Sequence, residues 1–573
     1  MCRLSWYPAP GAARRSRIGW VDLLVLAAVL ILLMGIVRLG SGMAAPLSAA
    51  SHISLSPWNL PLYAGESLLR IVIAFLFSLV FAIAYGYAAA KTRLGQRLLV
   101  PLLDILQSVP VLGFLSATVA FFAGLFPGST VGLEIASVFA IFTAQAWNMA
   151  FSFYHTEMTL SRDLQEASQV YRLGRWQRLW YLELPSSAIS LILNSMMSFG
   201  GSWFFLAASE NVTYAGRSYL LPGVGSYMAV AEQRGDVGAM VAAVFVMIVL
   251  IVAVDQIFWR PVVAWSQRFK MEQTRSLDEP SSFVLTILQR SVLVSLLERK
   301  VLRPTLEAAL ATLSRPRRRR RTQRLGQGTL GSFAGLVAVA VLTWAAFAGA
   351  HLLHGIDLAV VLHVFWLGIL TFLRVAAAVL LGALWAVPAG VYIGLSPRVS
   401  SWAQPVAQIA ASFPANMLFP VVVAILLRLH TGLNIGAVPL MMLGTQWYIL
   451  FNVMAGTIAI PSDLKEAARV FGLRGGLRWR QLILPAIFPS LVTGGVTAAG
   501  GAWNASIVAE VASWGGRQVT AQGVGAYITL ATAHGRFGEI LLGIAVMSLL
   551  VVATNRLIWR PLYRLAETKY HID

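Results

Sequence analysis

The stretch that decides the fold is residues 461–485, which read PSDLKEAARVFGLRGGLRWRQLILP. Ser462 and Asp463 are helix-start residues, and an acid in the first turn of a helix suits the helix dipole. Gly472 can end that short helix with a positive φ, and Pro485 fits the first turn of the next helix. The pattern predicts a helix–turn–helix that exposes a small, charged surface, which suits docking into a groove of another protein.

A second copy of this stretch begins at residue 161 and reads SRDLQEASQVYRLGRWQRLWYLELP, an offset of 300 residues. The same offset holds over much of the chain and becomes 304 upstream, which a change of length in one loop explains. Matches at offset 300 include Trp147 with Trp447, Asp163 with Asp463, Glu166 with Glu466, Leu184-Pro185 with Leu484-Pro485, Trp203 with Trp503, Glu210 with Glu510 and Gly223-Val224-Gly225 with Gly523-Val524-Gly525. Matches at offset 304 include Arg70 with Arg374, Ser108 with Ser412 and Pro110 with Pro414. The chain is therefore an internal repeat of two similar halves.

The composition indicates a membrane protein. The 573 residues are 58% hydrophobic and 12% charged, whereas soluble chains carry about 25% charged residues. Apolar stretches long enough to cross a bilayer as helices number about six in each half. They cover residues 20–37, 68–90, 99–125, 131–153, 188–208 and 237–258, then 330–353, 365–393, 406–429, 435–454, 487–511 and 540–558. Regular alternation of polar and apolar residues does not dominate, which argues against a β-barrel.

The charge distribution predicts the topology. Lys and Arg total 44 against 24 Asp and Glu, a net charge of +20, and the basic residues cluster between apolar stretches. In the first half the clusters are Arg14, Arg15 and Arg17; Lys91, Arg93 and Arg97; Arg162, Arg172, Arg175 and Arg178; and Arg260 and Arg268. They fall on one side of a six-span count, which the positive-inside rule assigns to the cytoplasm, together with both chain ends. This topology explains most of the positive charge without binding to nucleic acid. The stretch at 20–37 could instead be the hydrophobic core of a signal peptide.

An even number of spans in each copy makes the two copies point the same way, related by a pseudo-twofold axis along the membrane normal. The predicted fold is all-α and integral to the membrane. Its parts are a cytosolic basic tail at 1–19, repeat 1 at 20–262, a cytosolic linker at 263–328, repeat 2 at 329–564 and a cytosolic tail at 565–573. Within the linker, residues 283–313 have an amphipathic pattern that suits the membrane surface. The arginine run at 317–321 suits anionic lipid or nucleic acid, although anchoring the next span is the favoured reading.

The two loops resemble the EAA loop of the membrane subunits of binding-protein-dependent ABC importers. That family pattern is Glu-Ala-Ala, three residues, Gly, nine residues, an aliphatic, any residue and Leu-Pro. The residues that the resemblance assigns to ATPase coupling are Asp163, Glu166, Ala167, Ser168, Gly174, Leu184, Pro185, Asp463, Glu466, Ala467, Ala468, Gly472, Leu484 and Pro485. The first loop departs from the pattern with Ser168 and Arg172, and we expect Gly174 to take over the turn that Gly472 makes in the second loop.

The resemblance implies two tandem type I importer permease units in a bacterial inner membrane. It implies as partners two cytosolic ATPase subunits and an extracytoplasmic solute-binding protein, with the lipid bilayer around the spans. None of the five lysines follows a glycine, so a phosphate-binding Gly-Lys loop is absent and the chain has no ATPase site of its own. No cofactor is expected on this chain, because ATP would be used by the partner.

A subfamily can be proposed from the end of the fifth span. The sequences Ala208-Ser209-Glu210 and Val508-Ala509-Glu510 each precede a Gly-Val-Gly segment, as the nitrate/sulfonate/taurine-type permeases have Ala-Glu before Gly-Leu-Gly-Tyr. The implied substrate is an oxyanion or small organic anion. A fused iron or thiamine importer permease is the alternative with the same mechanism. Glu210 and Glu510 are expected near the outer surface, as gate residues or structural hydrogen-bond partners.

Polar residues deep in spans are candidates for the transport pathway, or else bind helices together. The candidates are Gln107, Ser108, Gln145, Trp147, Asn148, Asn194, Trp203, Ser412, Gln446, Trp447, Trp503 and Asn504.

Other functions fit less well. A single cysteine, Cys2, excludes a cysteine-rich metal site, and His351, His354 and His363 have no counterpart in the first half, so no metal site is expected. A secondary transporter with two parallel six-helix halves is the main competing class, but it needs charged groups inside the membrane for ion coupling. An integral-membrane enzyme is disfavoured, because the sequence has no catalytic constellation.

Overall fold

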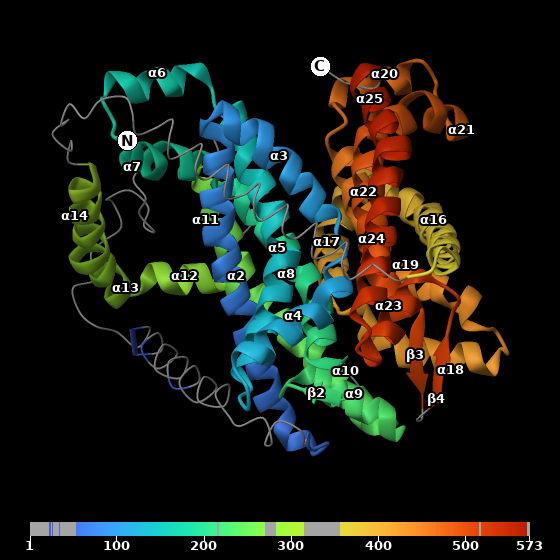
Figure 1. Cartoon of the computed structure of the whole chain (residues 1–573). Helices are drawn as coiled ribbons and strands as arrows, with labels where there is room; N and C mark the ends of the chain where they lie inside the picture. The colour runs from blue at the N-terminus through green and yellow to red at the C-terminus, as the bar shows by residue number, and fades with distance from the viewer. Residues whose placement is uncertain are drawn as a thin grey trace.

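The computed structural model describes residues 22, 23, 26, 34, 53–214, 217–269, 282–314, 356–514 and 517–569. The arginine run, the span predicted at 330–353 and nearly all of the span predicted at 20–37 lie outside these residues. The described parts of both halves have the same order of α-helices and strands (Figure 1). The first half comprises η1 (Pro57–Asn59), α2 (Leu60–Lys91), α3 (Arg93–Ser108), α4 (Val111–Leu125), α5 (Val131–Thr159), α6 (Arg162–Val170), α7 (Arg175–Arg178), η2 (Leu179–Glu183), α8 (Leu184–Ser209), β1 (Asn211–Tyr214), β2 (Arg217–Leu220), α9 (Val224–Arg234), α10 (Val237–Val254), η3 (Asp255–Trp259), α11 (Arg260–Ser266) and η4 (Gln267–Phe269).

The linker forms α12 (Phe283–Arg290), α13 (Val292–Leu297), η5 (Glu298–Leu302) and α14 (Arg303–Ser314). The second half comprises α16 (Leu358–Leu395), α17 (Pro397–Ser412), η6 (Ala415–Leu418), α18 (Phe419–Arg428), α19 (Leu433–Ile458), α20 (Ser462–Val470), α21 (Gly475–Arg478), η7 (Trp479–Ile483), α22 (Leu484–Ala509), β3 (Val511–Trp514), β4 (Arg517–Thr520), α23 (Val524–Ala533), α24 (Phe537–Thr554), η8 (Asn555–Trp559) and α25 (Arg560–Lys569). The protein is an all-α membrane protein whose two antiparallel hairpins, β1–β2 and β3–β4, are small additions.

Eight helices in the described part of the chain are long and apolar enough to cross a membrane. A ninth candidate is the pair 397–412 and 415–426, whose helices meet at an angle of 80°. The prediction of one unbroken span at 99–125 and at 406–429 was therefore wrong. Both spans break immediately before a proline, at Val109 (ψ 123°) and Phe413 (ψ 129°). A residue that precedes proline is driven from helical to extended backbone, so the breaks at Pro110 and Pro414 have a local cause.

Proline also explains the π-helical segments. Each of the segments η2, η3, η5, η7 and η8 ends two residues before a proline, at Pro185, Pro261, Pro304, Pro485 and Pro561. Proline has no N–H to donate and its ring clashes with the carbonyl four residues earlier, and a wider turn relieves that clash. Pro485 lies in the first turn of α22, as predicted, and η7 joins α21 to α22 so that the helical run covers Gly475–Ala509.

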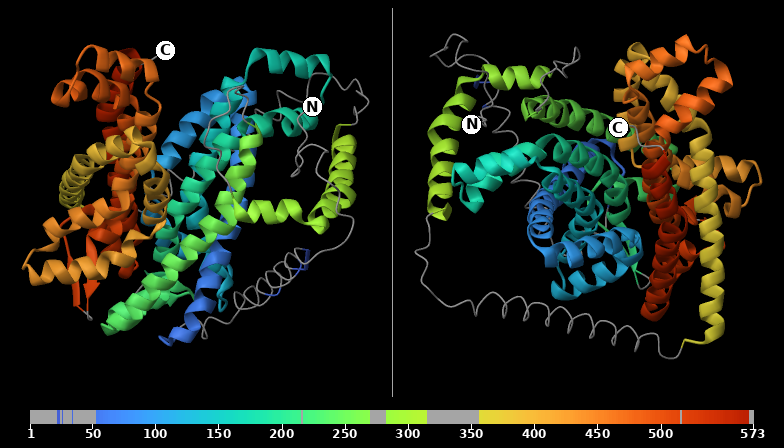
Figure 2. Two further views of the ribbon diagram at one scale, coloured as in Figure 1. Left: turned by 180° about the vertical axis from the view of Figure 1, so that it is seen from behind. Right: turned by 90° about the horizontal axis from the view of Figure 1, so that it is seen from above.

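The two halves lie side by side and point the same way. The short helices α6, α7, α20 and α21 lie at one end of the molecule, whereas the two hairpins lie at the other end (Figures 1 and 2). The broken span of each half packs against the other half. In the first half α4 packs against α22, α23 and α24, and in the second half α17 packs against α8 and α10. Across this interface the Val111 N–H donates to Asn504 Oδ1 at 2.7 Å. The interface is thus reciprocal, as a pseudo-twofold dimer requires.

A buried polar anchor ties each hairpin to its own half. In the first half the Arg70 guanidinium, which is fully buried in α2, donates two hydrogen bonds to the Glu134 carboxylate, at 2.5 and 2.7 Å. It also donates to Glu210 at 2.8 Å, at the end of α8. The Ser67 hydroxyl donates to Glu210 and accepts from the Val224 N–H. We call Ser67, Arg70, Glu134 and Glu210 the first anchor.

The second half repeats this anchor with one change. Arg374 donates to Glu510 at 2.9 Å, and Thr371 takes the place of Ser67 by donating to Glu510 at 2.7 Å. At the position of Glu134 stands Asn434, whose backbone and side-chain oxygens accept from Arg374 at 2.8 and 3.1 Å. The second anchor is Thr371, Arg374, Asn434 and Glu510.

The anchors explain the Gly-Val-Gly segments. A Cβ at Gly223 or Gly523 would collide with the carboxylate of Glu210 or Glu510. The Gly225 N–H donates to Glu210 at 2.7 Å, so the backbone itself supplies a hydrogen bond to the buried charge. Glu210 and Glu510 are therefore structural hydrogen-bond partners, one of the two predicted roles, and both side chains are fully buried.

The anchor makes a prediction about stability. Replacing Arg70→Met leaves two buried carboxylates without their cation, and breaking a buried ion pair in this way costs about 3–5 kcal/mol. We expect a clearly lower unfolding temperature of the detergent-purified chain, followed by tryptophan fluorescence. Glu134→Asn copies the second anchor and should lower that temperature much less. Equal unfolding temperatures for Arg70→Met and the unaltered chain would contradict the anchor's role.

Candidate functional site

The two repeated loops have the same fold and the same exposure. In α6 and α20 the side chains of Glu166 and Glu466 are exposed, those of Ala167 and Ala467 are half-buried, and Ser168 and Ala468 are buried. The residues that end the two helices carry large apolar side chains into solvent. Val170 and Tyr171 are 78% and 74% exposed, and Val470 and Phe471 are 83% and 80% exposed. Each loop thus presents a short charged helix with an apolar tip, a surface that resembles the core and rim of a protein interface.

Both loops turn by the same hydrogen bonds. The Leu173 N–H donates to the Ser168 carbonyl and the Leu473 N–H to the Ala468 carbonyl, at 3.1 and 2.9 Å. This is the Schellman arrangement, which needs a left-handed residue directly before the donor. In the second loop that residue is Gly472, at φ +66°, as predicted.

In the first loop the prediction for Gly174 was wrong. Arg172 itself adopts the left-handed conformation, at φ +49°, whereas Gly174 has φ −65° and begins α7. Its N–H donates to Gln177 Oε1 at 2.9 Å. The reason is the register of the turn: the Schellman bonds fix which residue is left-handed, and a glycine two positions later cannot replace it.

The bases of the two loops are held by different chemistry. Under the first loop, Lys91 at the end of α2 donates to Glu157 at 2.6 Å and to Glu183 at 2.5 Å, and Arg178 of α7 lies 2.9 Å from Glu183. Both carboxylates are almost fully buried. This ion cluster joins α2, α5, α7 and η2.

In the second half the matching positions are Leu395, Thr457 and Ile483. Ile483 is a buried member of an apolar cluster, and Leu395 packs against it. The same place is therefore filled by apolar packing. In addition, the linker helix α14 contacts α7 of the first loop. The exposed surfaces of the two loops are therefore similar, whereas the residues that hold the base of each loop differ.

The proposed pathway residues mostly contact neighbouring helices. Asn148 donates to Ser198 at 3.0 Å, and Asn194 to Ser152 at 3.1 Å. Gln446 accepts from the Trp385 indole, and Trp447 packs edge-on against the same Trp385 ring. Trp147 packs against Phe81, and Trp503 stacks on Phe372.

Other candidates are placed as follows. Gln107 is exposed, Ser108 ends α3, and Asn504 bridges the halves through its bond with Val111. Gln145 is fully buried, and neither its amide oxygen nor its nitrogen has a hydrogen-bond partner. Trp203 and Ser412 line a narrow gap between α8 and α17, together with Phe199 and Gln408.

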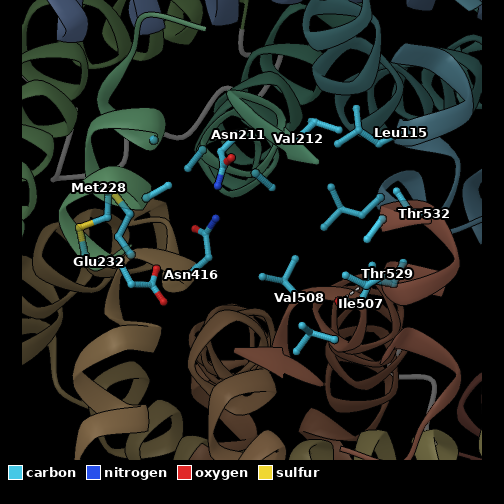
Figure 3. Close-up of a pocket in the computed structure, with 18 of the residues that line it drawn as sticks. Leu115, Asn211, Val212, Met228, Glu232, Asn416, Ile507, Val508, Thr529 and Thr532 are labelled. Atoms are coloured by element: carbon cyan, nitrogen blue, oxygen red, sulfur yellow. Dashed lines mark hydrogen bonds between the residues drawn. The ribbon is translucent and has the colours of Figure 1, made fainter. Parts of the chain in front are cut away.

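A cavity of about 500 Å³ lies between the halves at the hairpin end (Figure 3). Its walls come from matched pairs of residues: Leu112 with Asn416, Ala207 with Ile507, Ala208 with Val508, Asn211 with Val511, Met228 with Ile528, Ala229 with Thr529 and Glu232 with Thr532. It therefore lies on the pseudo-twofold axis. The sequence reasoning missed its polar residues Asn211, Glu232 and Asn416, because they lie outside the spans as predicted or at the break of one.

A second cavity, of about 820 Å³, lies toward the loop end. It is lined by residues of α8 and α11 from the first half and of α17 and α19 from the second, including Gln404, Gln408 and Asn452. The narrow gap beside Trp203 shares Met196, Asp255 and Gln408 with this cavity. In the described ranges, no group of three His, Cys, Asp or Glu side chains could hold a metal ion.

An all-α membrane protein with two parallel units, each with a two-helix loop exposed at the same end, has the architecture of a fused double importer permease. Comparison with known families agrees. Residues 78–258 and 378–560 each match the family described as binding-protein-dependent transport system inner membrane component. The two matches cover more than half of the chain, which therefore belongs to this family, with one permease unit in each half.

Curated relatives are similar to part of the chain. It is 27% identical over 194 residues to nitrate import permease protein NrtB of Leptolyngbya laminosa, covering 34% of this chain and 66% of the relative. The figures for glycine betaine/carnitine transport permease protein GbuB of Listeria monocytogenes are 27% over 200 residues, covering 34% and 65%. Those for bicarbonate transport system permease protein CmpB of Synechococcus elongatus are 27% over 181 residues, covering 31% and 62%. The chain thus spans just under two thirds of the length of these relatives.

The turn geometry gives a prediction for the first loop. A left-handed backbone costs a residue with a side chain about 1 kcal/mol more than glycine. Arg172→Gly should therefore slow amide hydrogen exchange of Leu173 about fivefold, if exchange follows local opening of the loop. Gly472→Arg should speed exchange of Leu473 by a similar factor. Unchanged exchange in both variants, measured by mass spectrometry of the purified chain, would contradict this assignment of the turn.

Proposed function

We propose that this chain supplies both permease halves of an ATP-driven importer. Its two halves form the substrate pathway between them, and α6 and α20 each dock one cytosolic ATPase subunit. An extracytoplasmic solute-binding protein delivers the substrate to the hairpin end. The loop end then faces the cytoplasm of a bacterial cell, together with both chain ends, and the chain hydrolyses no ATP.

The observation that carries the proposal is the pair of loops. Two short charged helices with exposed apolar tips lie at matched positions and at the same end of a duplicated unit. They suit two partners that are themselves related by a twofold axis. Glu166 and Glu466 are exposed and have no role in the packing of the spans, so a role toward a partner is the natural one. A secondary transporter with the same architecture would not need these two docking surfaces.

The names of the relatives support a proposal for the substrate class. The relatives are named for the transport of nitrate, bicarbonate, and glycine betaine or carnitine. Nitrate and bicarbonate are small oxyanions, and glycine betaine and carnitine carry a carboxylate. We propose a small substrate that bears an oxyanion group, such as a carboxylate or a sulfonate. The central cavity, at about 500 Å³, is large enough for a small organic molecule.

The docking proposal is tested by co-purification. We expect the chain, extracted from its native membrane in mild detergent, to carry stoichiometric ATPase subunits. Glu166→Ala and Glu466→Ala should each weaken that association, and the double variant should lose most of it, with the unfolding temperature unchanged. Glu307→Ala, which removes an exposed carboxylate from α14, is the matched control and should retain the ATPase.

Two results would contradict this function. One is full ATPase retention by the double variant. The other is a lone chain whose solute uptake follows an ion gradient and ignores ATP depletion, which would make the protein a secondary transporter.

A further inference from the structure

The two large cavities between the halves are separate. On α8 the central cavity is lined by Ala207 and Ala208, whereas the second cavity, which we call the loop-end cavity, is lined by Leu193, Met196 and Met197. The two cavities share no lining residue among those that the structure describes. At a rise of about 1.5 Å per residue, about 15 Å of α8 separates Met197 from Ala207. A substrate that passes between the halves must cross this segment.

One aromatic ring lies between the halves in this segment. Gly201 of α8 and Gly501 of α22 are matched positions of the repeat, at the offset of 300 residues. A Cβ added at Gly201 would lie 3.1 Å from Tyr448 Oη, and a Cβ added at Gly501 would lie 3.3 Å from Tyr448 Cε2. Tyr448 belongs to α19 of the second half, so its ring reaches across to α8 of the first half. A ring that contacts both members of a matched pair lies at the pseudo-twofold axis.

The two glycines make room for this ring. Ordinary contacts between carbon atoms lie at about 3.5–4.0 Å, so a methyl group at Gly201 or Gly501 would crowd Tyr448. Asn452, one helical turn further along α19, lines the loop-end cavity. The Tyr448 ring therefore lies between that cavity and the central cavity.

The matched position in the first half carries a residue that stays within its own half. Asn148 of α5 corresponds to Tyr448, and its Nδ2 donates to Ser198 Oγ of α8 at 3.0 Å. A point on a twofold axis has room for only one of two equivalent side chains, so a second tyrosine would collide with the first. This constraint explains why the two halves differ at this position.

We propose that Tyr448 closes the passage between the central cavity and the loop-end cavity, and that its ring moves aside when α8 and α22 separate. The glycines meet the ring through van der Waals contact, which weakens steeply as the helices move apart. The second half alone thus supplies the residue that closes a pathway built from both halves. This inference rests on the proposed function, since it names the residue that divides the substrate pathway of that importer.

The test measures access through the full chain from the hairpin side. Cys2 is replaced by serine, and Gln404→Cys places a single cysteine in the lining of the loop-end cavity. Cells with an opened outer envelope are treated with 2-sulfonatoethyl methanethiosulfonate, a membrane-impermeant anion, and modification is followed by mass spectrometry. If the unaltered passage is open in a minor conformation of about 10% or less, Tyr448→Ala should speed modification about tenfold.

Three variants complete the test. Tyr448→Phe keeps the ring and should leave modification slow. Tyr392→Ala removes an exposed ring from α16 of the same half and should also leave it slow. Tyr448→Asn, which copies Asn148, should speed modification as Tyr448→Ala does, and it decides the test if Tyr448→Ala fails to fold. Equal rates with and without the Tyr448 ring, or rapid modification with the ring in place, would overturn the inference.

The proposed function is measured separately, by ATPase co-purification with the same variants. A chain that carries its ATPase but is modified at the same rate with and without the ring refutes this inference alone. A rate that depends on the ring, in a chain that carries no ATPase, supports the closing role of Tyr448 and refutes the docking proposal.

Discussion

A guanidinium buried beside a carboxylate holds the hairpin end of each half together. Arg70 with Glu210, and Arg374 with Glu510, join the long helix of each unit to the end of its α8 or α22. Neither charge can stay buried without the other, because an unpaired charge in a poorly solvated site is strongly disfavoured. The hydroxyl of Ser67 or Thr371 and the N–H groups after Gly223 or Gly523 complete the hydrogen bonds of the carboxylate. The hairpins, and hence the hairpin end of the central cavity, are positioned by this contact.

The two halves diverge in sets of residues that touch one another. Lys91, Glu157 and Glu183 form an ion cluster in one half, and Leu395, Thr457 and Ile483 occupy the matching places in the other. Changing one member alone would leave a buried charge unpaired, which explains why the whole set differs. Glu134 and Asn434 differ without a change of their arginine, because each still accepts hydrogen bonds from it and the arginine keeps Glu210 or Glu510 as its partner. Fusion of the halves into one chain allows such divergence, because each half then meets only its own partner.

The sequence predicted what depends on local pattern and spacing. Both short helices of the loops, the parallel repeat and the left-handed turn at Gly472 follow from residues close together in the chain. The errors concern proline and glycine, whose effects depend on register: Pro110 and Pro414 break a span, and Arg172 rather than Gly174 is left-handed. The cavity and the anchors depend on contacts between distant segments. A signal for the anchors was present, because Arg70 and Arg374 are matched charges inside apolar stretches.

The central claim is that the two halves point the same way, with both loops on the cytoplasmic side. Site-directed cysteine labelling tests it directly, because Cys2 is the only native cysteine and can be replaced by serine. Single cysteines are placed at Glu166 and Glu466 in the loops, and at Arg234 and His534, which are exposed at the hairpin end. A membrane-impermeant maleimide should label positions 234 and 534 in cells with an opened outer envelope, and positions 166 and 466 only after the membrane is permeabilised. Labelling of 166 and 466 from opposite faces would contradict the parallel repeat.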